Sequence, residues 1–89
     1  MDLGTLVGRN VRRERRAAGL TQEELAHRTG LDRTYLSDIE RGIRNPTVLW
    51  LQDIADALSI HPAVLLVEEQ EAPAVKMALL PKDTNGGSR

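Results

Sequence analysis

The sequence predicts an all-α fold of five helices, and three observations support that prediction. Apolar residues recur every three or four positions through most of the 89-residue chain, which is the period of an amphipathic helix. Glycines and capping residues divide these stretches into short segments. The composition is 40% hydrophobic but only 2% aromatic, so we expect an aliphatic core of packed helices. A chain of this length has room for a single domain with a marginal core.

A first amphipathic helix is predicted over residues 3–18. Its apolar stripe is formed by Leu3, Val7 and Val11, which recur every four residues, and Gly19 follows as a C-terminal stop. The arginines of this segment lie mostly off the stripe, and the sequence leaves open whether their face is solvated or contacts phosphate. These arginines are Arg9, Arg12, Arg13 and Arg16.

Two short helices joined by a tight turn follow, and this arrangement is a helix-turn-helix. The first begins at a capping box, in which Thr21 caps the amide of Glu24, and it ends at Gly30. The second has Asp32 as its natural N-cap and ends at Gly42. The pattern is weakly specific by itself, and the surrounding helices make it a much stronger signal.

Two further helices complete the predicted domain, which we expect to cover residues 1–67. A fourth helix begins at Pro46 or Thr47, and its inner face carries Leu51, Ile54, Ala55 and Leu58 at helical spacing. A short fifth helix is predicted over residues 62–66, with a proline in its first turn. Residues 68–89 are acidic and then glycine-rich, and we expect a partly disordered tail that is dispensable for ligand binding.

The charge of the chain is unevenly distributed, although the net charge is only −1. Residues 1–46 hold nine arginines against seven acids, whereas residues 47–89 hold three bases against six acids. Arginine forms a better fork for phosphate and guanine than lysine does. The first half therefore has the charge pattern of a local contact with nucleic acid.

Other classes of function find little support in the sequence. The chain has no cysteine, which excludes disulfides and thiolate metal sites. His27 and His61 lack a metal-ligand spacing, Ser37 and Ser59 have no evident base partner, and no glycine-rich phosphate loop occurs. We therefore expect no enzyme activity, metal, cofactor or small-molecule ligand. We also expect a cytoplasmic protein, because no segment has the length and apolarity of a secretory signal or a membrane span.

Several segments resemble those of the phage-repressor or Cro-like helix-turn-helix family, also called Xre-type, over about three quarters of the chain. The residues that carry this resemblance are Arg15, GLTQEELA at 19–26, Gly30, YLSDIERG at 35–42, Asn45-Pro46 and IADAL at 54–58. Residues 31–47 (LDRTYLSDIERGIRNPT) further resemble the controller proteins of restriction–modification systems. The resemblance implies a lambda-repressor-like domain that binds a pseudo-palindromic operator in double-stranded DNA as a homodimer and regulates transcription.

The resemblance also implies roles for individual residues. The second helix of the motif enters the major groove, so we expect its N-terminal residues to read bases; these are Arg33, Thr34 and Ser37. Contacts with the DNA backbone are expected from Gln22, Tyr35, Arg44 and Asn45. A structural ion pair is expected between Arg15 and Glu40. The chain is short and the end of its fifth helix is apolar, so we expect a dimer surface made of Trp50, Leu65, Leu66 and Val67.

Two alternatives from other classes stay open at this stage. The first is an interaction module that keeps the fold without binding DNA, and the donor on Arg33 argues against it. The second is an antitoxin-like partner whose tail folds on another protein, for which the apolar stretch at 74–80 is suitable. The sequence does not specify the operator, the regulated genes or the direction of regulation.

Overall fold

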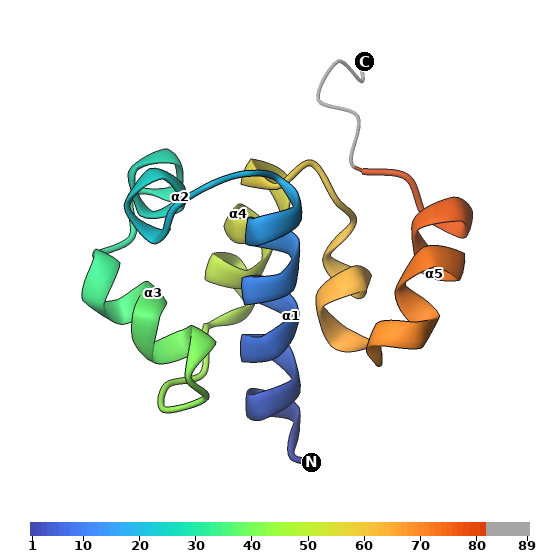
Figure 1. Ribbon diagram of the computed structural model, residues 1–89, viewed down its shortest axis with the longest axis horizontal. Coiled ribbons are helices and arrows are strands. Elements are labelled where there is room, and N and C mark those ends of the chain that lie inside the picture. Colours follow the sequence, from blue (N-terminus) through green and yellow to red (C-terminus); the bar gives the residue numbers. More distant parts are fainter. Residues whose placement is uncertain (82–89) are drawn as a thin grey trace.

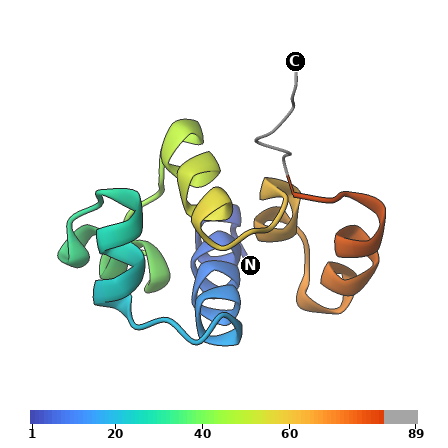
Figure 2. The same cartoon turned by 90° about the horizontal axis from the view of Figure 1, so that it is seen from above.

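The computed structural model describes residues 1–81 and confirms the all-α prediction. Five α-helices occur in this range, together with two short 3₁₀ segments and no strand. The central helix α1 lies between the α2–α3 pair on one side and η1 and α5 on the other, and α4 covers a third side (Figures 1 and 2). The elements are α1 (Leu3–Ala17), α2 (Gln22–Thr29), α3 (Arg33–Glu40), α4 (Val48–Ala57), η1 (Pro62–Leu66), η2 (Glu69–Glu71) and α5 (Ala72–Ala78).

Each of the first four helices begins at a side-chain cap that satisfies an otherwise unpaired backbone amide. The caps are Asp2, Thr21, Asp32 and Thr47. The predicted capping box of α2 is present, with the Glu24 carboxylate accepting a 2.8 Å bond from the Thr21 amide. This bond lowers the pKa of Glu24, so the cap is complete at neutral pH and weakens as pH falls through that lowered pKa.

The core is aliphatic and is formed by the inner faces of α1, α2, α3, α4 and η1. Its fully buried members include Val11, Leu25, Leu36, Ile39, Ile54 and Leu65. Helix α1 approaches α3 closely because residue 8 is glycine. A Cβ at Gly8 would collide with the backbone carbonyl oxygen of Ile39. This close approach fixes the end of α3 against α1 and leaves the start of α3 free to project outward.

The fifth helix differs from the sequence prediction in both type and position. Residues 62–66 form the 3₁₀ segment η1, in which His61 Nδ1 accepts a 3.0 Å bond from the amide of Ala63. The fifth α-helix is α5, which lies in the segment predicted as tail. Pro73 occupies its first turn, where a missing amide costs nothing. From the sequence we expected no helix in this segment, whereas Pro73 stands at the start of one.

Residues 68–78, which we call the C-terminal arm, lie on the side of α1 opposite the α2–α3 pair and pack against η1 (Figure 1). Ala72 is only 3% exposed, and Lys76 Nζ lies 2.9 Å from Glu14 Oε1 on α1. The chain leading into the arm is also held, because Asn10 Nδ2 donates to the carbonyls of Leu65 and Val67. The glycine-rich end of the expected tail, residues 82–89, lies outside the described residues.

Truncation of the chain after Val67 is expected to lower the free energy of unfolding by about 1–3 kcal/mol. The truncation removes Lys76 and leaves the nearly buried Glu14 carboxylate paired with Arg13 alone. Urea unfolding of the full and truncated chains measures the difference. If the chain binds DNA as the resemblance implies, its affinity should change by less than about tenfold at a temperature where both chains are folded. Equal stability of the two chains would show that the arm adds nothing to the fold.

Candidate nucleic-acid interface

Helices α2 and α3 are joined by a tight turn that presents the first residues of α3 to solvent. Gly30 has φ +81°, a left-handed conformation that ends α2 and that glycine adopts without strain. Leu31 is buried beneath the turn, and the Asp32 side chain accepts a 2.7 Å bond from the amide of Thr34. Arg33 and Thr34 are exposed beside this cap. The turn therefore fixes the position of α3 while leaving its first two side chains accessible.

Arg15 and Glu40 form a buried ion pair that ties α1 to the end of α3. Arg15 Nε lies 2.7 Å from Glu40 Oε2 and Nη2 lies 3.0 Å from Oε1, and the two residues are 8% and 6% exposed. The hydrogen bond from Arg15 to Glu40 raises the pKa of the guanidinium. Arg15 also donates a 2.8 Å bond to the carbonyl of Leu20, in the connection that leads into α2.

The carboxamide of Gln22 continues this network to the surface. Gln22 Nε2 donates a 3.1 Å bond to Glu40 Oε1, and Arg33 Nη1 donates a 3.3 Å bond to Gln22 Oε1. A single chain of hydrogen bonds thus runs from the buried Arg15 to the exposed Arg33. From the sequence we expected Gln22 to contact a DNA phosphate. Its hydrogen bond with Arg33 was missed because the two residues belong to different helices.

The loop after α3 is fastened to the outer side of that helix. Tyr35 Oη donates a 3.4 Å bond to the carbonyl of Asn45, and the Arg44 guanidinium lies 5.5 Å from the Tyr35 ring centre. The Asp38 carboxylate lies 3.6 Å from both Arg41 Nη2 and Arg44 Nε. From the sequence we did not predict that Asp38 would pair with these two arginines. The available signal was the position of Asp38 three residues before Arg41, a spacing that brings opposite charges together on a helix.

The residues expected to contact DNA therefore lie on α2, α3 and the loop that follows α3. Arg33, Thr34, Arg44 and Asn45 are exposed, whereas Gln22, Tyr35 and Ser37 are half-buried. The exposed side chains among them are at the start of α3 and in the loop, at opposite ends of the helix. This arrangement offers the exposed first turn of α3 to the major groove and places further polar groups at the start of α2 and in the loop after α3 for the phosphate backbone.

The residues expected at the dimer surface do not all lie at the surface. Leu65 is fully buried in the protomer, so its predicted place in an intersubunit contact is wrong. Trp50 is half-buried and packs against the core of its own chain, and Val67 is half-buried. Leu66 is exposed. The physical reason is that a 3₁₀ turn points neighbouring apolar residues to different sides, and η1 uses Val64 and Leu65 for its own core.

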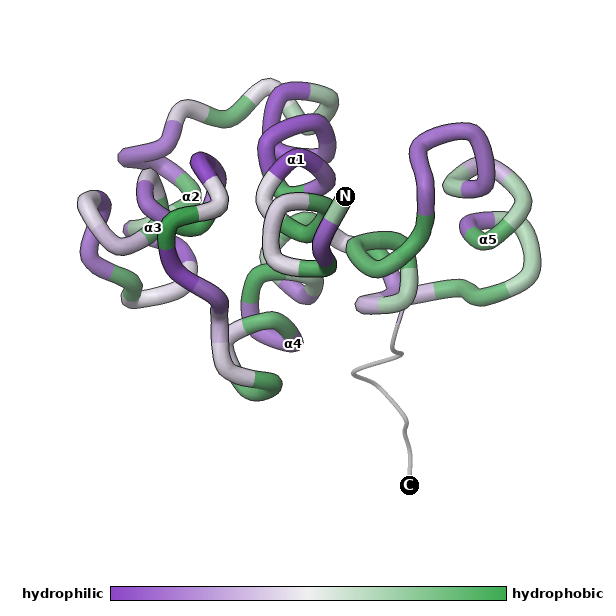
Figure 3. Tube along the Cα trace, turned by 90° about the horizontal axis from the view of Figure 1, so that it is seen from below, coloured by the Kyte–Doolittle hydropathy of each residue, from purple (hydrophilic) through white to green (hydrophobic). Residues whose placement is uncertain are grey.

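An apolar groove next to Leu66 was not foreseen from the sequence. It runs between α4, η1 and the start of α1, and we call it the α4 groove; its lining includes Leu3, Val48, Leu51 and Leu66. Figure 3 shows hydrophobic segments of α4 and η1 on this part of the molecule. Val48 is 80% exposed and contributes little to its own core. The sequence feature that could have revealed this groove is the pair of apolar residues, Val48 and Leu49, in the first turn of α4.

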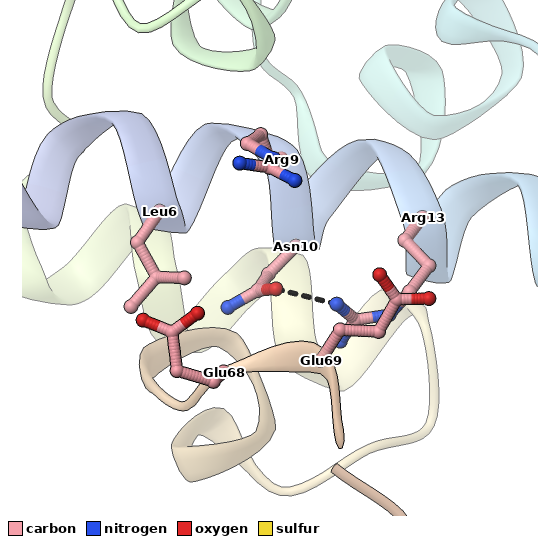
Figure 4. Close-up of a pocket in the computed structure, with 6 residues that line it drawn as sticks. All are labelled: Leu6, Arg9, Asn10, Arg13, Glu68 and Glu69. Atoms are coloured by element: carbon pink, nitrogen blue, oxygen red, sulfur yellow. Dashed lines mark hydrogen bonds between the residues drawn. The ribbon is translucent and has the colours of Figure 1, made fainter. Parts of the chain in front are cut away.

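A second, smaller pocket lies between α1 and the C-terminal arm, away from α3 (Figure 4). Its lining residues are Leu6, Arg9, Asn10, Arg13, Glu68 and Glu69. Arg13 donates to Asn10 there, and the groups form no arrangement suited to nucleophilic or acid–base chemistry. Within residues 1–81, no three histidine or acidic side chains gather as metal ligands. No helix in the same range has the length and apolarity to cross a membrane.

Comparison with known proteins agrees with this geometry. The helix-turn-helix family model matches residues 11–65. The HTH-type transcriptional regulator y4dJ of Sinorhizobium fredii is 48% identical over 82% of this chain and 95% of its own length. A hypothetical transcription factor, NHTF from Neisseria, has a solved structure with a TM-score of 0.76 and 38% identity, covering 82% of this chain and 84% of that one.

A third similar protein is the restriction–modification controller C.Esp1396I, solved as a tetramer in complex with its natural 35-base-pair operator. It is 38% identical to this chain with a TM-score of 0.67, and the match covers 73% of this chain and 86% of the controller. The resemblances inferred from the sequence are thereby confirmed. The chain belongs to the helix-turn-helix family.

Proposed function

We propose that this protein is a sequence-specific DNA-binding regulator of transcription that binds a pseudo-palindromic operator as a homodimer. The observation that supports the proposal most directly is the exposed Arg33 at the start of α3, held by Gln22 above a buried ion pair. The relatives are transcriptional regulators and give no support to the interaction-module or antitoxin alternatives. We also propose a cytoplasmic location, because a regulator of transcription has to reach the DNA that it controls.

Base recognition is assigned to the first two turns of α3. The Arg33 guanidinium can donate two hydrogen bonds to O6 and N7 of a guanine in the major groove. The Thr34 methyl group can contact a thymine methyl, and the Ser37 hydroxyl can pair with either a donor or an acceptor. The bond from Arg33 to Gln22 restricts the long arginine side chain before DNA arrives. Less conformational entropy is then lost on binding.

Backbone contacts are assigned to the two ends of the motif. The start of α2 presents Gln22 and free amides, and a helix N-terminus favours an anion such as phosphate. The loop after α3 presents Arg44 and Asn45, with Tyr35 beneath them. In the free protein Arg44 is held by Asp38 in an ion pair whose arginine side is exposed. Exposed pairs are weak, so a phosphate can replace the carboxylate at small cost.

The dimer is assigned to the α4 groove of each protomer. One reading helix contacts too few base pairs for strong specificity, whereas two related helices about 34–36 Å apart read successive turns of DNA. Val48 and Leu66 leave apolar surface that the protomer does not cover. A second copy of the same groove would cover it, as expected for a two-fold symmetric contact.

Replacing Val48 with aspartate is expected to raise the dimer dissociation constant by about a hundredfold or more, because a charge would be buried in an apolar contact. Sedimentation of the wild type and V48D at micromolar concentrations measures the change. The matched control is M77D on α5, because Met77 is 86% exposed and lies outside the groove. A monomeric wild type, or an effect of M77D equal to that of V48D, would contradict the assignment.

The proposed function is tested by selecting bound duplexes from a random pool with the wild-type protein. Enrichment of one sequence with two symmetric halves, about 10 base pairs apart from centre to centre, is the expected result. A pool that remains random after several rounds at moderate salt would overturn the proposal. The selected duplex also supplies the operator for the experiments described below.

A further inference from the structure

The outer face of α1 carries four arginines, and the function proposed above uses none of them. We call this the arginine face; it consists of Arg9, Arg12, Arg13 and Arg16. Their spacing of three, four and seven residues places them on one side of the helix. Figure 3 shows the hydrophilic side of α1 turned away from α4. Within residues 1–81, the ion pairs leave Arg9, Arg12 and Arg16 without a carboxylate partner.

The two flanks of the arginine face have different surroundings. On one flank, Arg9 and Arg13 line the small pocket with Glu68 and Glu69 of the C-terminal arm (Figure 4). Arg13 is also paired with Glu14 on its own helix. Negative charge from the same chain therefore already faces this flank, and an external anion would have to compete with it.

The other flank lies next to the proposed DNA surface. At about 100° per residue, Arg12 is roughly 60° and Arg16 roughly 100° around the helix from Arg15. Arg15 is the base of the network that passes through Glu40 to Gln22 at the start of α2. Figure 2 shows the connection from α1 to α2 running along the side of the molecule opposite α4. Arg12 and Arg16 thus border the end of the motif at which α2 meets phosphate in the proposed complex.

We propose that Arg12 and Arg16 bind the phosphate backbone of duplex DNA beyond the outer end of each half-site. This inference rests on the proposed function and extends the contact of each protomer past its reading helix. Guanidinium groups pair with phosphate oxygens through two parallel hydrogen bonds, and exposed arginines without carboxylate partners lose no ion pair in doing so. Because these phosphates lie outside the half-site, the contact depends on the length of the duplex rather than on the bases that α3 reads.

Operator duplexes of two lengths test the proposal. One ends at the outer base pair of each half-site, and the other carries about 10 further base pairs, or one helical turn, on both sides. The wild type should bind the long duplex about three- to tenfold more tightly and with a steeper dependence on salt, by about one unit for each added phosphate contact. The R12Q/R16Q double variant should bind both lengths equally and should match the wild type on the short duplex.

The matched control is R9Q, an exposed arginine on the other flank, and it should keep the wild-type difference between the two lengths. Glutamine has nearly the helix propensity of arginine, so circular dichroism should show all variants folded alike. The proposal is wrong if the wild type shows no preference for the long duplex, or if R12Q/R16Q retains that preference. The arginine face would then be solvated or would face an acidic protein. A wild type that fails to bind the short duplex would instead refute the proposed function itself.

Discussion

Replacing Glu40 with alanine is expected to lower the free energy of unfolding by about 3–5 kcal/mol, the cost of removing one partner from a buried ion pair. The substitution would leave the Arg15 guanidinium buried with only the carbonyl of Leu20 as an acceptor. It would also remove the acceptor for Gln22, so the orientation of Arg33 should become less defined. Urea unfolding at neutral pH measures the loss.

Two comparisons make this result specific. E23A changes an exposed acid on α2 and should alter stability by less than about 0.5 kcal/mol. The double variant R15M/E40M removes both charges and should be more stable than E40A, because no unpaired charge remains in the core. The hydrogen bond with Glu40 raises the pKa of Arg15, so this residue stays charged at neutral pH. Its contribution to the free energy of unfolding is lost only as pH rises through that raised pKa. An E40A chain as stable as E23A would refute the account of the ion pair.

Replacing Arg33 with alanine is expected to cost about 1–3 kcal/mol per half-site on the operator and much less on random DNA. Arg33 is exposed and its described hydrogen bond goes to Gln22, so the variant should fold normally. The energy lost is that of a guanidinium that donates two hydrogen bonds to a guanine edge. Binding isotherms on both DNAs, at several salt concentrations, measure the effect.

Arg44 provides the contrast for Arg33 because it lies in the loop after α3, where the backbone should be near. R44A should weaken binding to operator and random DNA similarly, and it should lower the salt slope by about one unit for each lost phosphate contact. Equal losses on both DNAs for R33A would make Arg33 a phosphate contact. No loss on either DNA would show that α3 does not read the operator.

The sequence was sufficient to predict the helices whose ends are encoded locally. Thr21 and Asp32 accept hydrogen bonds from backbone amides in their own turn, and Gly30 ends its helix in a left-handed conformation. The roles of these residues can therefore be predicted without knowledge of the fold. The 3.6-residue period also identified most of the buried side chains of α1 and α4, among them Val7, Val11 and Ile54, whereas Leu3 is exposed. Helix α5 was missed because it packs on η1 and buries only Ala72 among its seven residues, so the segment shows no amphipathic period.

The candidate site shows the same limit at the level of side chains. The start of α3 follows from the position of its cap, so Arg33 and Thr34 could be singled out from sequence. The bonds from Gln22 to both Glu40 and Arg33 connect three helices and appear only in the structure. Leu65 was assigned to the dimer surface instead of the core because the short segment η1 contains too few residues to show a helical period.

The central claim is that Arg33 at the start of α3 reads a base pair, and a second selection from the random pool tests it most directly. Wild type and R33A are carried through the same rounds at the same salt. The account predicts that the R33A motif keeps its symmetry and spacing but loses preference at one base pair in each half. An R33A motif identical to that of the wild type at every position would contradict the claim.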